Sequence, residues 1–281
     1  MSSRADLQCA QLVLCERPED SIVKRHLQSY SLIVLVVFFA GCASTGIGGG
    51  SSVSLDDEWQ LGNQMAAQVA QQVHVSTDPY VTAMGERLHA QTPLANRPFH
   101  FYVVDDASVN AFAIPGGHVY VNRGLIAQAD KANMLASVMA HEISHVVARH
   151  VIKQAEQQQL IGTIGGILLG QNPNGVATLA AQILAGGAMA RFSRADEKQA
   201  DDMGLDLMTR AGYDPHGMLD MFQKLLALDQ RGNSSVARFF ADHPGTTDRI
   251  KDIQSRIGNT RPAGIVDEPA YQQARRRLGA A

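Results

Sequence analysis

Apolar residues recur every three or four positions through much of the chain beyond residue 54, which is the spacing of an amphipathic α-helix. Ser54 precedes one such stretch, which reaches about Val73, and Asp78 and Pro79 precede a second. These residue types are typical of the amino ends of helices, where they accept free backbone N–H groups or fix φ. We therefore predict one helix over about 55–73 and another that begins at residue 79.

Short segments between residues 99 and 121 indicate a small sheet. Phe99, Phe101 and Val103 alternate with other residues, which is the period of a half-buried strand. Residues 111–114 and 118–121 flank a Pro-Gly-Gly sequence, which is typical of a β-hairpin. Because the chain after residue 130 has an almost wholly helical pattern, the predicted fold class is mainly α with a small β-sheet (α+β).

A His-Glu-Ile-Ser-His motif at residues 141–145 lies inside a predicted helix over about 131–155, with Asp130 as its N-cap. Residues four apart on a helix share a face and lie about 6 Å apart along its axis, so both imidazoles can reach one ion. Glu142 is the only formally charged residue between Leu135 and Ala148. Polar groups in such apolar surroundings need partners. A divalent metal ion is one solution, and hydrogen bonds within the helix are the other.

Zinc in hydrolases usually has three protein ligands and one open position. His141 and His145 supply two ligands, and the best candidate for the third is Glu197. Ser193 and Asp196 form an approximate capping box, which would place Glu197 in the first turn of the next helix.

Asp201 lies one helical turn beyond Glu197, on the same face. This position lets its carboxylate accept the N–H of a ligating imidazole, which fixes the tautomer and the orientation of the ring. The alternative for both residues is a solvated acidic face, since Asp196, Asp202 and Asp206 lie nearby in the sequence.

Residues 1–41 are typical of an export signal, because basic residues precede an apolar run from Leu32 to Ala40. That run is shorter than the ~20 residues that cross a bilayer. The four residues that end at Cys42 resemble a bacterial lipobox, so we expect Cys42 to carry the lipid anchor. Ala43 after it resembles lipoproteins sorted to the outer membrane, and residues 42–54 read as a Gly/Ser linker. A plain secreted protein with an incidental cysteine is the alternative.

The length of 281 residues and the hydrophobic content of 45% fit a globular protein. The net charge of −3 argues against nucleic acid as a partner, because proteins that grip phosphates are usually strongly basic. We expect one domain over residues 55–258 and a tail over 259–281 that is a solvated end.

With these motifs the chain resembles the HtpX-like and CAAX-prenyl-protease-like zinc metallopeptidases, most closely the small periplasmic lipoprotein peptidases of the LoiP type, which are related to BepA. The resemblance spans roughly residues 55–255 and implies a gluzincin-like zinc metallopeptidase domain with one Zn²⁺ per chain. Its further motifs are Asn110-Ala111-Phe112-Ala113, Pro115-Gly116-Gly117, Asn122-Arg123-Gly124-Leu125, Gly212-Tyr213-Asp214-Pro215, and His243-Pro244 followed by Arg249-Ile250.

Glu142 would then be the general base that takes a proton from the metal-bound water. The resemblance also implies His243 and Arg249 as candidates for stabilising the oxyanion. Alternatively, His243 caps the helix that begins near Thr246, and Arg249 braces that helix. A further hypothesis is that His243 occupies the open zinc position and keeps the enzyme latent.

The hairpin offers an explanation for substrate choice. A free edge strand over Asn110, Ala111, Phe112 and Ala113 would pair with any extended peptide backbone. His118 lies in the same hairpin and is more readily interpreted as a surface residue than as a ligand. Residues 160–190 are apolar and Gly-rich, and they fit a buried helical hairpin as well as a mobile lid or a membrane-contacting surface.

These observations favour a zinc-dependent endopeptidase of the bacterial cell envelope, anchored by lipid on the periplasmic face and acting on unfolded or flexible proteins in quality control. The alternative is a zinc-binding but proteolytically latent lipoprotein that acts as a chaperone-like protein or a scaffold. The sequence leaves the oligomeric state and the physiological substrate open.

Overall fold

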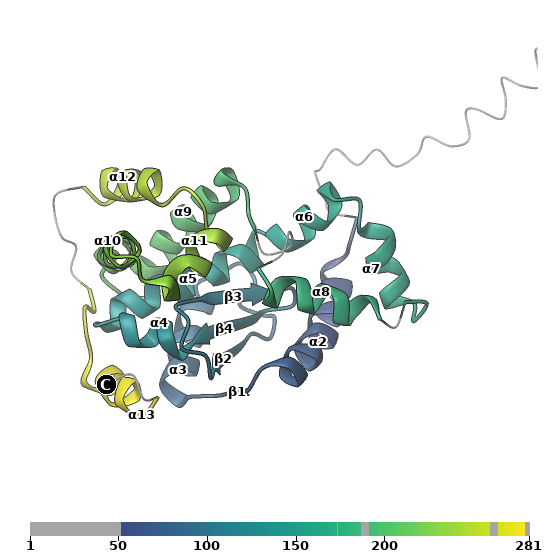
Figure 1. The fold of residues 1–281 in the computed structure, drawn as a ribbon, viewed down its shortest axis with the longest axis horizontal. Helices are drawn as coiled ribbons and strands as arrows, with labels where there is room; N and C mark the ends of the chain where they lie inside the picture. Colours follow the sequence, from purple (N-terminus) through teal and green to yellow (C-terminus); the bar gives the residue numbers. More distant parts are fainter. Residues whose placement is uncertain (1–51, 173, 187–190, 259–263, 279–281) are drawn as a thin grey trace, which may run out of the picture. The chain divides into compact units, whose positions relative to one another are not determined.

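The computed structural model describes residues 52–172, 174–186, 191–258 and 264–278. A four-stranded sheet with the order β1–β2–β4–β3 lies among the helices (Figure 1). Its strands are β1 (Val75–Ser76), β2 (His100–Val104), β3 (Ala111–Ile114) and β4 (His118–Asn122). The predicted class, mainly α with a small sheet, is confirmed. The predicted signal, Cys42 and all but the end of the predicted linker lie outside the described residues.

The helices begin where local sequence supplies the groups that their amino ends need. Ser54 accepts a hydrogen bond from the backbone N–H of Asp57, and Asp78 accepts one from that of Tyr80. The helices are α2 (Leu55–Gln72), α3 (Pro79–His89), α4 (Arg123–Gln128), α5 (Ala132–Val147), α6 (His150–Gln157), α7 (Ile161–Leu168), α8 (Gly175–Leu184), α9 (Arg194–Arg210), α10 (His216–Gln230), α11 (Ala237–Asp242), α12 (Thr246–Ile257) and α13 (Pro269–Arg277).

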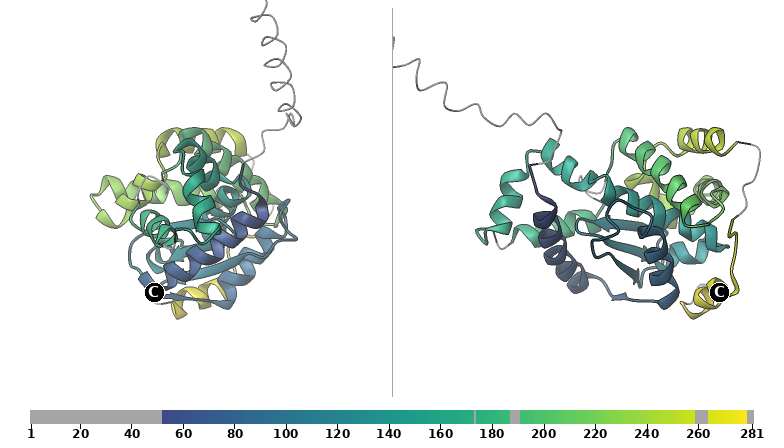
Figure 2. Two further views of the ribbon diagram at one scale, coloured as in Figure 1. Left: turned by 90° about the vertical axis from the view of Figure 1, so that its right-hand side faces the viewer. Right: turned by 180° about the vertical axis from the view of Figure 1, so that it is seen from behind.

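Both faces of the sheet are covered. On one face of β2, Phe101 and Val103 pack with α3 and α5. On the other face, Tyr102 and Val104 pack with α2. Strand β4 pairs in parallel with β2 and antiparallel with β3, and all its residues are buried. This arrangement leaves β3 at an edge of the sheet, on the side of α8 and α11 (Figures 1 and 2).

Helix α5 is the centre of the larger core, and all of its residues from Ala132 to Val146 are buried. It packs against β3 and β4 of the sheet and against α3, α9 and α10. A helix enclosed in this way holds its side chains in fixed rotamers. The residues of the 141–145 motif therefore project from a helix that is buried along almost its whole length.

The structure corrects the predicted helix over 131–155 at both ends. Its N-cap is Lys131 rather than Asp130, and the side chain of Lys131 makes no capping hydrogen bond. Asp267 acts instead, because its carboxylate accepts the backbone N–H of Ala132 at 3.1 Å. At the other end the helix breaks at Arg149, which adopts a left-handed conformation with φ of 57°. The chain then continues as α6 in a new direction.

The prediction of a solvated tail is wrong for residues 264–278. Helix α13 packs on α3, and Tyr271 is fully buried, with its hydroxyl donating to the backbone oxygen of Ala129. Arg277 pairs with Asp78 at the start of α3 at 2.6 Å. Basic residues in the sequence suggest exposure to solvent, but the burial of Tyr271 and the ion pair of Arg277 attach this segment to the domain.

Residues 160–190 form a packed hairpin as far as the structure describes them. Ile164 and Ile167 of α7 and Leu179 and Ile183 of α8 are buried against α2. The buried-hairpin alternative therefore fits these residues, although Leu169 at the turn is 73% exposed. Among the described residues, no helix combines the length and the apolar character needed to cross a membrane.

His118 is buried rather than exposed, which corrects the interpretation of it as a surface residue. One of its ring nitrogens lies 3.1 Å from the side-chain oxygen of Asn63 on α2. The ring also stacks with His100 and Tyr102 of β2. Sequence alternation could not show this burial, because it depends on α2 covering the second face of the sheet.

Candidate metal centre

The three predicted metal ligands converge in the interior. His141 and His145 project from one face of α5, and Glu197 projects from the first turn of α9. The capping box of Ser193 and Asp196 starts that helix, as the sequence predicts. The Nε2 atoms of the two histidines lie 2.9 Å apart, and the Glu197 carboxylate oxygens lie 3.4 Å from His141 Nε2 and 3.5 Å from His145 Nε2.

His243 brings a fourth donor to the same point. Its Nδ1 lies 3.1 Å from Glu197 Oε1 and 3.4 Å from His141 Nε2. One ligand atom from each of the four residues lies within 4.8 Å of all the others, and all four side chains are buried. His243 does not cap the following helix, because the N-cap of α12 is Gly245 and no side chain caps it.

This donor set fits a zinc ion. Zinc binds imidazole nitrogen and carboxylate oxygen at about 2.0–2.2 Å, so neighbouring donors of a tetrahedral site lie about 3.3–3.6 Å apart. The distances above fall near this range. Two imidazole nitrogens that point at each other need either a shared proton or an ion between them, and two histidines with a glutamate form a typical hydrolytic zinc set.

Asp201 lies where the sequence predicts, on the outer side of His141. Its Oδ1 is 2.9 Å from His141 Nδ1, and Arg249 donates to both oxygens of the same carboxylate at 2.7 Å. Burial alone would lower the pKa of His141, but its contacts with Asp201 and Glu197 raise that pKa to about 9. Without a metal ion and near neutral pH, the imidazole of His141 is therefore in its charged form, with a proton on both ring nitrogens.

Arg249 faces the acidic side of the centre. Its guanidinium forms ion pairs with Glu197 and Asp201 and lies over the ring of Phe222, with the guanidinium carbon 4.5 Å from the ring centroid. Burial opposes ionisation of Glu197, but the electrostatic influence of His243 and Arg249 holds its pKa well below its usual value. Arg249 lies on α12, and these ion pairs connect that helix to Glu197 and Asp201 on α9.

Glu142 points to another side of the centre. Its Oε1 lies 3.5 Å from His243 Nε2 and has no hydrogen-bond partner among the described residues. Burial raises the pKa of this carboxyl, so it is a stronger base than an exposed glutamate. The hollow that Glu142 lines is completed by β3, the ends of α8 and α11, Phe192 and His243 (Ala111, Phe112, Ala113, Ile183, Phe192, Asp242, His243).

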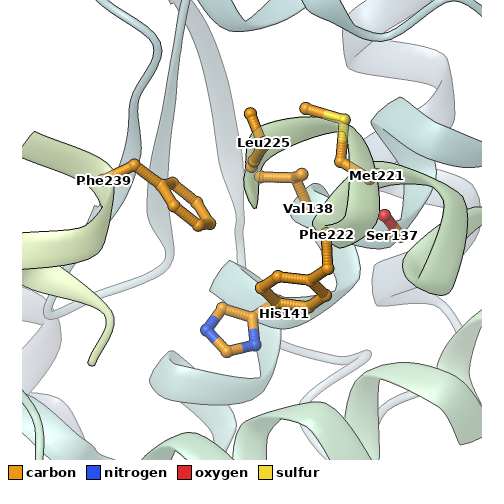
Figure 3. Close-up of a pocket in the computed structure, with 7 residues that line it drawn as sticks. All are labelled: Ser137, Val138, His141, Met221, Phe222, Leu225 and Phe239. Carbon is orange, nitrogen blue, oxygen red and sulfur yellow. The ribbon is translucent and has the colours of Figure 1, made fainter. Parts of the chain in front are cut away.

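A second hollow opens on the other side of His141 (Figure 3). Apart from His141 and Ser137, its walls are apolar and come from α5, α10 and α11 (Val138, Met221, Phe222, Leu225, Phe239). Helix α11 therefore contributes to both hollows, through Phe239 to the apolar one and through Asp242 to the one that Glu142 lines.

Two residues at the centre were missed by sequence reasoning. Phe192 stacks on the ring of His145 with centroids 4.0 Å apart, and His150 contacts the far nitrogen of His145. A third histidine soon after the motif was the available signal for His150. Nothing in the sequence around Phe192 indicated its contact.

Comparison with known proteins agrees with this geometry. Residues 75–257 match the model of peptidase family M48. The chain is 33% identical over 257 residues to the beta-barrel assembly-enhancing protease of Escherichia coli (strain K12), which covers 85% of this chain and 52% of that protein. The chain thus spans about half the length of that relative.

Two further relatives carry metallopeptidase names. The mitochondrial metalloendopeptidase OMA1 of Schizosaccharomyces pombe is 28% identical over 211 residues, which cover 73% of this chain and 62% of that protein. The metalloprotease LoiP of Escherichia coli (strain K12) is 29% identical over 180 residues, which cover 62% of this chain and 67% of that protein.

Proposed function

Because this chain belongs to peptidase family M48, we propose that it is a zinc-dependent endopeptidase that hydrolyses peptide bonds of unfolded or flexible proteins in the bacterial cell envelope. Family membership confirms the resemblance to the LoiP- and BepA-related metallopeptidases and the zinc metallopeptidase class. The observation that carries the proposal is the convergence of His141, His145 and Glu197 beside Glu142.

The roles of the side chains follow from their positions. A zinc ion held by His141, His145 and Glu197 would supply a Lewis acid that lowers the pKa of a bound water toward ~7. Glu142 accepts the proton of the attacking water and delivers it to the leaving amine. Asp201 accepts the Nδ1–H of His141, which keeps Nε2 free for the metal. Arg249 positions Asp201 and Glu197 rather than touching the substrate.

Strand β3 is suited to hold an extended substrate. Asn122 N–H donates to the backbone oxygen of Asn110, and ladder bonds in an antiparallel pair alternate. Phe112 therefore directs its backbone groups to β4, whereas Ala111 and Ala113 direct theirs to the free edge. A peptide that pairs with this edge enters the hollow lined by Glu142. Main-chain pairing of this kind selects extended chains and not particular side chains.

His243 controls whether the fourth coordination position of the zinc ion is free for water and substrate. Its Nδ1 lies among the donor atoms of the other three ligands, which supports the hypothesis that His243 fills the fourth zinc position and keeps the enzyme latent. Stabilisation of the oxyanion by His243 is the competing role. His243→Ala should raise basal casein cleavage if His243 blocks the metal, and an equal or lower rate would contradict latency.

Lipid attachment at Cys42 would hold the peptidase on the periplasmic face of the outer membrane. Bacterial relatives named for β-barrel assembly support this placement. A stable lipoprotein anchor needs no membrane-spanning helix. Metabolic labelling of the wild-type chain and of Cys42→Ser with a radioactive fatty acid tests the anchor directly.

The second candidate function is that of a zinc-binding but proteolytically latent lipoprotein, which acts as a scaffold or a chaperone-like protein. The same position of His243 favours it. Glu142→Gln separates the two candidates, because it should keep zinc but abolish cleavage of casein by the His243→Ala form. Glu86→Gln, at an exposed position of α3, is the matched control and should retain activity. If the cellular role survives Glu142→Gln, the endopeptidase proposal is wrong.

A further inference from the structure

His150 occupies a place on His145 that corresponds to the place of Asp201 on His141. It is 1% exposed, and its Nδ1 lies 2.8 Å from the Nδ1 of His145. Its other ring nitrogen, Nε2, lies 3.2 Å from Oε1 of Gln199 and 3.5 Å from Oδ1 of Asp196, both on α9. His150 thus links the second histidine of the motif to the helix that carries Glu197.

The break between α5 and α6 creates this contact. On an unbroken helix a residue five positions beyond His145 would be turned by about 140° from it. The left-handed conformation of Arg149, with φ of 57°, redirects the chain so that His150 returns to the ring of His145. Arg149 is held there by Glu58 and by the backbone oxygen of Val53, each at 2.6 Å. An ion pair to α2 therefore fixes an otherwise disfavoured backbone geometry.

The hydrogen bonds around His150 can run in only one direction if His145 is to bind a metal. His145 Nε2 faces the other donors and must then carry no proton, so the single proton of the neutral ring lies on Nδ1. That N–H has to be donated to His150 Nδ1, which leaves the proton of His150 on Nε2. The oxygens of Gln199 and Asp196 are the acceptors at that atom.

We propose that His150 is a positioning residue that fixes the metal-binding tautomer and the orientation of His145, through a relay that ends on Gln199. It is not itself a ligand, because its Nδ1 faces the back of His145 and it lies outside the donor cluster. The two histidines of the motif are thus oriented differently, His141 by a carboxylate and His145 by a neutral imidazole. The proposal rests on the zinc site, and its test measures zinc binding rather than proteolysis.

The decisive measurement is the zinc dissociation constant, obtained by competition with a chelator. His150→Leu removes the acceptor at similar volume and should weaken zinc binding by about 10- to 100-fold. In His150→Asn the side-chain oxygen lies near the position of Nδ1, so this variant should recover most of the affinity. His89→Leu replaces another buried histidine, the last residue of α3, whose Nε2 lies 2.9 Å from the backbone oxygen of Leu94. This variant should bind zinc like the wild type.

Each result has one meaning. Wild-type affinity in a folded His150→Leu protein would overturn the proposal, as would a failure of His150→Asn to exceed the leucine variant. Should the leucine variant not fold, nitrogen-15 NMR of the zinc-loaded wild-type protein decides, because His150 must then carry its proton on Nε2 and a proton on Nδ1 would overturn the proposal. A wild-type protein that binds no zinc would instead refute the metal centre itself.

Discussion

Arg249 donates from Nε and Nη2 to both carboxylate oxygens of Asp201, each at 2.7 Å, in the interior of the protein. The same guanidinium pairs with Glu197. Together with the protonated His141, it offsets two buried carboxylates, so we expect the stability of the metal-free protein to depend on it more than on an exposed ion pair.

Arg249→Met should destabilise the metal-free protein by about 3–5 kcal/mol, because two buried carboxylates would lose the guanidinium that pairs with both and keep only His141 as a cationic partner. Urea unfolding in the presence of a chelator measures this loss. Arg256→Met removes a half-exposed cation from Asp202 and Asp206 and should cost below about 1 kcal/mol. Equal effects of the two substitutions would contradict the role given to Arg249.

Zinc binding should strengthen as the pH rises toward 9. The contacts of His141 with Asp201 and Glu197 raise its pKa to about 9, so below that pH zinc has to displace a proton from this ring. His145, whose pKa burial lowers well below its usual value, adds no such competition near neutral pH. Chelator competition between pH 6.5 and 8.5 should show the apparent affinity rising by about tenfold per pH unit. An affinity that stays flat over this range would refute the assignment.

A rise in pH, which should strengthen zinc binding, should lower the free energy of unfolding of the metal-free protein, because His141 then loses its proton. A group whose pKa is higher in the folded state stabilises the fold below its unfolded pKa, and this contribution is lost as the pH passes the folded value. The folded value is about 9, so this stabilisation should decline from about pH 6.5 to about pH 9. Urea unfolding of the metal-free protein over this range should show the decline, and Asp201→Asn should reduce it.

Ala113→Pro tests the edge strand. Proline removes an N–H that faces the free edge and spares the ladder to β4, a position that strands tolerate. We expect normal folding and about a tenfold loss of casein cleavage in the His243→Ala background, because one main-chain hydrogen bond to substrate is lost. Ala113→Ser keeps the N–H and is the control. Full activity of a folded proline variant would show that substrate does not pair there.

Helix α11 is fastened to its neighbours by a cluster of polar contacts. Arg238 donates to the backbone oxygens of Ile183 and Leu184 at the end of α8, and Asp242 accepts from Asn110 at 3.3 Å. His243 follows directly, so these contacts hold it in the centre.

Arg238→Gln should therefore release His243 and raise basal cleavage of casein by roughly tenfold, since hydrogen bonds from a charged group contribute about 1.5–3 kcal/mol. The control is the same substitution in the His243→Ala background, where nothing remains to release and no increase is expected. An equal increase in both backgrounds would show that Arg238 acts on something other than His243.

The sequence predicted the parts of the site that depend on local spacing. His141 and His145 share a face because of helical geometry, and the capping box at Ser193 places Glu197 in a first turn. The left-handed Arg149 could not be predicted, because arginine does not favour that conformation and the partners that hold it are about 90 residues away. The burial of Tyr271 likewise depends on contacts between distant segments.

The amino end of α5 has its own dependence on a distant segment. Ala132 N–H donates to Asp267, and Asn133 N–H donates to the backbone oxygen of Val266 at 3.0 Å. During synthesis these acceptors leave the ribosome more than a hundred residues after the helix that they complete. A nascent chain thus carries its metal-binding helix with a frayed start, so full assembly of the centre awaits residues 264–278.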